Sequence, residues 1–153
     1  MGFGQHTRCA KADLLSYATG EYKNPDGSPC GAVKSSGLWG HNRLYVIRDN
    51  GQHEWRLHKT AVVLLHANGE LTINNGGWRT QTTSAAVREA ISLLSADGNT
   101  LARNVAGYWH NAKKGGAAVR FYVAGEAREF SFATWGRFGL GKGAGEFKML
   151  QHD

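Results

Sequence analysis

Hydrophobic and polar residues alternate along two neighbouring segments of the chain, residues 43–48 (RLYVIR) and 53–58 (HEWRLH). Alternation with a period of two is typical of a β-strand that buries one face. An Asn-Gly dipeptide between the segments favours the tight turn of a hairpin. The same features recur in residues 60–66 (TAVVLLH) and 70–74 (ELTIN), which a second Asn-Gly pair separates. The sequence therefore predicts two consecutive β-hairpins.

The return strand of the first hairpin predicts which side chains are buried. Trp55 and Leu57 lie on one face of this strand, because residues two apart share a face. Glu54, Arg56 and His58 lie on the other face. We expect the first pair to enter the core and the three polar residues to lie on an exposed strand face.

The periodicity changes at residues 84–95, where apolar residues follow helical spacing. Val87, Ala90, Ile91 and Leu94 stand at positions i, i+3, i+4 and i+7, which places them on one face of an α-helix. The turn sequence DGN follows this segment and supplies a stop. The pattern predicts an amphipathic helix with one buried stripe.

Alternation returns after a polar and basic connection that ends in HNAKKGG. The segments AAVRFYV and AREFSF flank the turn sequence AGE, and Val119 and Phe121 alternate with Arg120 and Tyr122. A last short strand is expected at residues 146–150 (EFKML). The predicted fold class is α+β, with antiparallel β-hairpins packed against one central amphipathic helix.

The N-terminal part of the chain has a different pattern. Residues 10–18 (AKADLLSYA) predict a short helix, and residues 19–40 are rich in glycine, serine and turn dipeptides, which is typical of a long loop. We therefore divide the chain into residues 1–40, a short helix with a Gly/Ser-rich loop, and residues 41–153, an α+β core domain with a glycine-rich C-terminal loop.

Composition and charge narrow the classes of function. The 153 residues carry a net charge of +6, which favours polyanionic partners such as nucleic acid. No segment approaches the ~18 consecutive apolar residues of a membrane span, and the N-terminus lacks the apolar core of a secretory signal. We expect a cytoplasmic protein without a membrane partner.

The two cysteines are too few for a disulfide framework. His6, Cys9, Cys30 and His41 include residue types that bind zinc, but the long interval between the cysteines fits zinc patterns poorly. Two buried free thiols are the favoured interpretation.

Hydroxyl residues and a cation gather where the predicted helix begins, in the stretch GGWRTQTTS. Thr82, Thr83 and Ser84 are competent N-caps, since their side chains accept hydrogen bonds from unpaired backbone N–H groups. The first turn carries no acidic residue, so the helix dipole and Arg79 also favour a bound phosphate or carboxylate. Trp78 beside them offers a stacking surface. The stretch predicts either helix caps or an anion site.

The same stretch resembles a segment of small bacteriophage proteins, in which a strand and an asparagine-containing turn precede G-G-W-R-T-x-T-T and a helix. The resemblance covers roughly residues 56–135 and is specific at six positions: Gly77, Trp78, Arg79, Thr80, Thr82 and Thr83. It implies a phage or prophage origin, with location in the host cytoplasm, and no particular chemistry. The six positions are also our candidate anion-binding residues.

Catalytic motifs are absent from the chain. Residues 136–143 match G-x-x-x-x-G-K, but Gly143 stands where a phosphate-binding loop needs Ser or Thr, so a flexible basic loop with Arg137 and Lys142 is the better interpretation. We assign no catalytic residue and expect no cofactor. If the protein is an enzyme, His58 or His66 is the candidate for general acid–base chemistry.

The sequence thus favours a non-enzymatic phage accessory protein. We expect it to bind nucleic acid or a host complex that handles nucleic acid, as a host-takeover or anti-defence inhibitor. The candidate nucleic-acid contacts are basic residues: Arg56, Lys113, Lys114, Arg120, Arg137 and Lys142. Two alternatives remain, a small enzyme acting on a nucleotide or nucleic acid through His58 or His66, and a structural or virion-associated protein.

Overall fold

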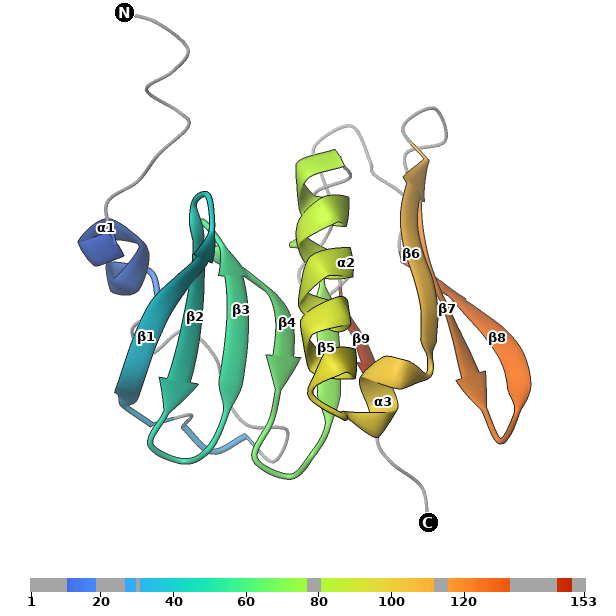
Figure 1. Cartoon of the computed structure of the whole chain (residues 1–153), viewed down its shortest axis with the longest axis horizontal. Helices are drawn as coiled ribbons and strands as arrows, with labels where there is room; N and C mark the ends of the chain where they lie inside the picture. Colours follow the sequence, from blue (N-terminus) through green and yellow to red (C-terminus); the bar gives the residue numbers. More distant parts are fainter. Residues whose placement is uncertain are drawn as a thin grey trace, which may run out of the picture.

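The computed structural model describes residues 11–18, 27–29, 31–76, 81–111, 116–132 and 146–149. These residues form a mixed α+β fold with two antiparallel sheets and three helices (Figure 1). The elements in chain order are α1 (Lys11–Ser16), β1 (Val33–Gly40), β2 (Arg43–Arg48), β3 (His53–Leu57), β4 (Thr60–Leu65), β5 (Leu71–Asn74), α2 (Gln81–Ala96), α3 (Thr100–Arg103), β6 (Val105–Asn111), β7 (Gly116–Val123), β8 (Glu126–Ser131) and β9 (Glu146–Met149).

The larger sheet has six strands in the order β1-β2-β3-β4-β5-β9, and each neighbouring pair is antiparallel. The two hairpins predicted from the Asn-Gly turns are confirmed as β2–β3 and β4–β5. The C-terminal strand β9 pairs with β5 in the register Ile73↔Phe147. This pairing joins residues far apart in the sequence.

Strand β1 corrects the expectation that residues 19–40 form a loop throughout. It pairs with β2 in the register Ser36↔Val46, although its own sequence VKSSGLWG lacks alternation. The strand exists because the edge of β2 offers backbone partners, and backbone hydrogen bonding does not depend on side-chain pattern.

Helix α2 buries the stripe predicted from its spacing. Val87, Ala90, Ile91 and Leu94 are all buried, and Figure 1 shows the helix lying between the two sheets. The helix begins at Gln81, three residues before the expected start. The prediction that Thr82, Thr83 and Ser84 cap the helix is therefore wrong, because these residues lie inside its first turn.

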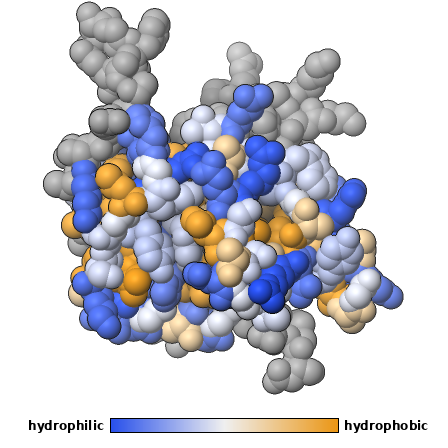
Figure 2. All heavy atoms as spheres, viewed as in Figure 1, coloured by the Kyte–Doolittle hydropathy of each residue, from blue (hydrophilic) through white to orange (hydrophobic). Residues whose placement is uncertain are grey.

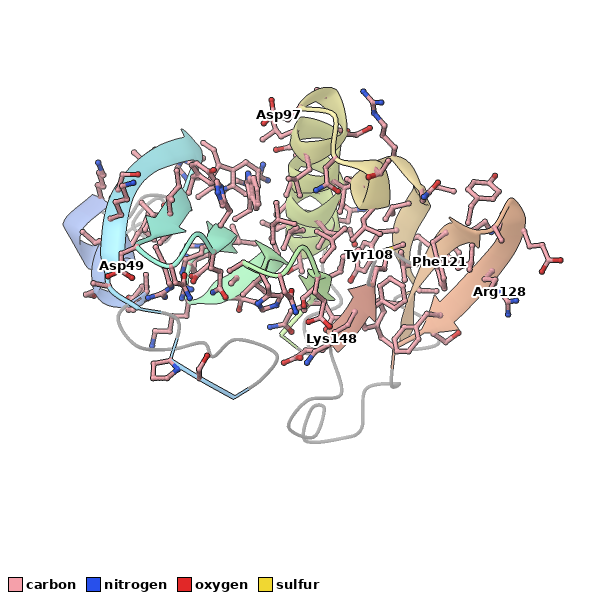
Figure 3. The ribbon with its side chains drawn as sticks, turned by 90° about the horizontal axis from the view of Figure 1, so that it is seen from below. Asp49, Asp97, Tyr108, Phe121, Arg128 and Lys148 are labelled. Atoms are coloured by element: carbon pink, nitrogen blue, oxygen red, sulfur yellow. The ribbon has the colours of Figure 1, made fainter. Side chains whose placement is uncertain are left out.

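The smaller sheet has the order β6-β7-β8 and contains the predicted third hairpin. Its inner face packs on the same core as α2, with Tyr108, Val119 and Phe132 buried. Figure 3 shows Tyr108 and Phe121 in the region between the sheets and Arg128 on β8 at the far edge. Helix α3 and strand β6 occupy a region expected to be a polar connection. The α+β class with antiparallel strands is confirmed, but the described part of the chain has two sheets and three helices rather than one helix on hairpins.

The second face of the larger sheet is covered by α1 over β2. Leu14 and Ala18 of α1 form a separate apolar cluster with Leu44 and Val46. Beside this cluster the strand face carries Arg48, Glu54 and Arg56, all fully buried. Hydrophilic residues interrupt the apolar ones on the face of the molecule seen in Figure 2, as expected for a surface in contact with water.

Candidate functional site

The structure describes only part of the predicted anion site. Gly77, Trp78, Arg79 and Thr80 lie outside the described residues, as do four of the basic candidates and three of the metal candidates: Lys113, Lys114, Arg137, Lys142, His6, Cys9 and Cys30. The fourth metal candidate, His41, is exposed, and the described residues contain no group of three or more potential metal ligands. The remaining candidates are described below.

A pocket of about 460 Å³ lies beside the first turn of α2. Its lining residues come from three separate segments: Tyr17, Leu57, His58, Lys59, Thr60, Thr82 and Thr83. Thr82 and Thr83 belong to the predicted anion site, and His58 was predicted separately as an acid–base candidate. The tertiary structure thus joins two sequence predictions in one pocket, and none of its described lining residues is acidic.

The histidine reaches this pocket from a strained turn. His58 and Lys59 form the two-residue connection between β3 and β4, and the backbone of His58 has φ 50°. Positive φ is uncommon for residues other than glycine, and hairpin turns of this length favour Gly or Asn at such positions. A side chain retained at a strained backbone position is a recognised feature of functional sites.

Arg56 is buried next to the pocket and donates hydrogen bonds to the backbone of two segments that line it. Its Nη2 donates to the carbonyl oxygen of Tyr17 at 3.0 Å and to that of Lys59 at 3.1 Å, while its Nη1 donates to Glu54 Oε1 at 2.7 Å. The expectation that Arg56 and Glu54 lie on an exposed strand face is wrong, since both are 0% exposed. Burial is tolerated because the charge is paired with the Glu54 carboxylate and both Nη atoms donate hydrogen bonds. Arg56 therefore shapes the pocket and has no surface with which to contact a nucleic acid.

The electrostatics of the pocket are set by one exposed cation and one half-buried imidazole. The Lys59 ammonium lies 5.1 Å from the centre of the Tyr17 ring, a cation–π contact that holds it at the pocket rim. Burial, with a smaller effect from nearby His41, holds the pKa of His58 below its ordinary value. His58 is therefore neutral at neutral pH, when its imidazole is able to donate and accept hydrogen bonds.

His66, the second acid–base candidate, lies elsewhere and is enclosed. It is 7% exposed, and its Nδ1 and Nε2 lie 2.9 Å from Gln52 Oε1 and Thr72 Oγ1 respectively. Both ring nitrogens are occupied within the protein, so His66 is poorly placed to exchange protons with a substrate.

The outer face of the smaller sheet carries a second group of exposed side chains. Trp109 of β6 is 37% exposed and Tyr122 of β7 is 43% exposed. Arg120 lies between them, and its guanidinium carbon is 5.5 Å from the centre of the Trp109 ring. Arg120 was predicted as a nucleic-acid contact, and the structure places it on an exposed face. Trp109 was missed because its segment lacks an extended alternating pattern, although the VRFYV alternation identified its partner strand.

Comparison with known protein families, curated proteins and solved structures finds no match for this chain. Among the residues that the structure describes, the helices are all too short or too polar to cross a membrane.

Proposed function

We propose that the protein binds nucleic acid without catalysis, and that the pocket beside α2 holds one phosphate of the ligand. The observation that carries the proposal is the meeting of Thr82 and Thr83 with Lys59 and His58 in one pocket lined by no described acidic residue. The net charge of +6 supports a polyanionic ligand.

The elements of this pocket have complementary roles toward a phosphate. The Lys59 ammonium supplies the positive charge, and the exposed hydroxyl of Thr82 supplies a hydrogen-bond donor. Helix α2 adds the positive end of its dipole and has no acidic residue in its first turn. The β3–β4 turn positions Lys59 and the first turn of α2 positions Thr82, so both groups are in place before the ligand binds. This preorganisation reduces the entropy lost on binding.

The resemblance of residues 77–83 to phage proteins extends the proposal to a biological setting. A phage accessory protein of this kind acts in the host cytoplasm by occupying a nucleic acid or a host complex that handles one, as an inhibitor in host takeover or anti-defence. Its positive net charge argues against mimicry of DNA, which requires an acidic surface.

Equilibrium binding of a short fluorescent oligonucleotide tests the proposal. Lys59→Ala and Thr82→Val are expected to weaken binding, with Lys59→Ala reducing the slope of log K against log salt by about one. Lys34→Ala is the matched control, because Lys34 is an exposed lysine on β1. Equal affinities for Lys59→Ala and Lys34→Ala would show that bulk charge alone attracts the ligand.

A small enzyme acting on a nucleotide or nucleic acid is the second candidate function. It is favoured by the position of His58, a neutral imidazole at the pocket beside a cation suited to phosphate. In this case the wild type converts the oligonucleotide to a product that mass spectrometry detects, and His58→Gln does not. An oligonucleotide recovered unchanged after long incubation with the wild type supports the non-catalytic proposal.

A further inference from the structure

The outer face of the β6-β7-β8 sheet carries exposed aromatic side chains on which planar rings are able to stack. Side chains on this face come from alternate positions, so that Trp109 lies opposite Ala118, and Arg120 lies opposite Gly107. Tyr122 lies opposite Ala127 on the other side of β7. We infer that this face binds the bases of single-stranded nucleic acid, which stack on Trp109 and Tyr122 on either side of Arg120. The inference rests on the proposed function and specifies its ligand.

Small residues beside the two aromatic side chains leave the rings accessible. Ala118 and Ala127 project no further than a methyl group, and a Cβ built at Gly107 would meet nothing within 4 Å. These three small residues therefore do not obstruct a base that approaches the indole of Trp109 or the phenol of Tyr122. Base–aromatic stacking tolerates any sequence, because every base has a π-face.

The fold does not need these aromatic residues for its core. The inner face of the same sheet supplies the core with Tyr108, Val119 and Phe132, whereas Trp109 and Tyr122 point the opposite way. The guanidinium of Arg120 already stacks on Trp109, which is the arrangement that extends a π-surface and adds a cation for the phosphates between bases. An apolar protein partner would bury the charged side chains of Arg120 and of Glu129, which lies opposite it on β8, and removing these charges from water costs free energy.

The salt dependence of binding distinguishes the contribution of this face from that of the pocket, because the two sites differ in charge. Glu129 lies opposite Arg120 across β7 and β8, so the two formal charges of this register pair cancel. Stacking on this face therefore depends weakly on salt, while the phosphate contact at Lys59 depends on it strongly. The bases of a duplex are stacked and paired inside the helix and cannot reach the aromatic rings. The face consequently selects single strands.

The experiment compares binding of oligothymidylate and of a duplex with the full-length protein at low and high salt. We expect the wild type to prefer oligothymidylate, and Trp109→Ala and Tyr122→Ser each to lose about tenfold in affinity at high salt. Trp109→Phe keeps an aromatic ring and is expected to retain most of the affinity. Leu93→Ser is the matched control, because Leu93 is an exposed apolar residue on α2, away from this sheet. Thermal unfolding of each variant shows that the fold is intact, and Tyr122→Ser serves if Trp109→Ala does not fold.

Three results overturn the inference in distinguishable ways. Equal affinity for both ligands, with the aromatic variants unchanged, removes this face as the binding surface and leaves the proposed function standing. Failure of the wild type to bind either ligand removes the proposed function as well. Self-association in ultracentrifugation that Trp109→Ala abolishes would assign the face to a second copy of the chain.

Discussion

The backbone strain at His58 has consequences for both the free energy of unfolding and ligand binding. Its φ of 50° favours glycine, yet a histidine occupies the position and its side chain lines the pocket with Lys59. Ala124 is a comparable position, with φ 51° in the turn between β7 and β8, and it is not among the residues that line the pocket beside α2. The two positions allow backbone strain and ligand contact to be separated.

We expect His58→Gly to raise the free energy of unfolding by about 0.5–1 kcal/mol, because glycine adopts positive φ without a steric cost. The same substitution is expected to weaken oligonucleotide binding, because the imidazole leaves the pocket. Ala124→Gly serves as the control, with a similar gain in stability and unchanged binding. A loss of stability in His58→Gly would show that the histidine side chain contributes more to the fold than its backbone costs.

His66 gives a second prediction at the residue scale, on the pH dependence of stability. Burial, with a smaller effect from Lys148, holds its pKa below the ordinary value of 6.5, against an opposing effect of Glu54. The unfolded chain therefore binds a proton at a higher pH than the folded chain does. The free energy of unfolding is expected to fall as the pH drops below about 6.5, and to stop falling once the pH is below the pKa of the folded state.

Chemical denaturation at a series of pH values measures this effect. His66→Gln is expected to give a shallower decrease in stability on acidification than the wild type. His53 and His58 also have pKa values lowered by burial, so part of the decrease remains in the variant. A variant with the wild-type pH profile would show that His66 does not contribute.

At the scale of elements, buried charges connect α1 to the larger sheet. Arg48 donates to Glu54 and to the carbonyl oxygen of Ala18, just after α1, and Arg56 donates to the carbonyl oxygen of Tyr17. Gln52 donates to the same carboxylate at 2.7 Å. The two guanidinium groups thus pair with one carboxylate and also donate to the carbonyl groups of the two residues that follow α1.

Glu54→Gln is expected to lower the free energy of unfolding by about 3–5 kcal/mol, because two buried guanidinium groups lose the carboxylate that neutralises them. Hydrogen exchange of residues 11–18 should also become faster, since α1 depends on the same groups. Glu126→Gln is the matched control, because Glu126 pairs with Arg128 at an exposed position and is expected to change stability by less than about 0.5 kcal/mol. Equal effects of the two substitutions would contradict this assignment.

At the scale of the whole molecule, one hydrophobic core joins both sheets to α2. Trp55 and Ile73 come from the larger sheet, Val119 from the smaller sheet and Leu94 from α2, all in the same buried cluster. Phe147 of β9 completes the connection, because its ring lies 4.8 Å from that of Phe121 and 5.0 Å from that of Phe130 (centre to centre). The sheets therefore share their buried surface.

We expect the chain to unfold in one cooperative transition. Phe147→Ala is expected to lower the free energy of unfolding by about 3–5 kcal/mol, and the variant should still unfold in a single transition. Fluorescence and far-ultraviolet circular dichroism should report coincident denaturation curves for both proteins. Leu93→Ala removes an exposed apolar side chain from α2 and is expected to have a small effect. Two separate transitions in the wild type would show that the sheets are independent units.

The prediction of the fold succeeded where a local signal was sufficient. Asn-Gly turns identified the hairpins, and the spacing of Val87, Ala90, Ile91 and Leu94 identified the buried face of α2. Strand β1 and strand β6 were missed, because each is defined by the backbone of a neighbouring strand. The proximity of Thr82 and Thr83 to His58 was not predicted, because no sequence pattern connects positions so far apart.

The sequence by itself determined the hairpins, the apolar stripe of α2 and the positive charge, because each depends on residues close together in the chain or on composition alone. Only the tertiary structure decided that Arg56 is buried and that Trp109 is exposed, because an alternating strand does not reveal what covers each of its faces. It also decided that the β3–β4 turn and the first turn of α2 line one pocket. Burial and proximity are properties of the packed chain, in which distant segments exclude water from one another.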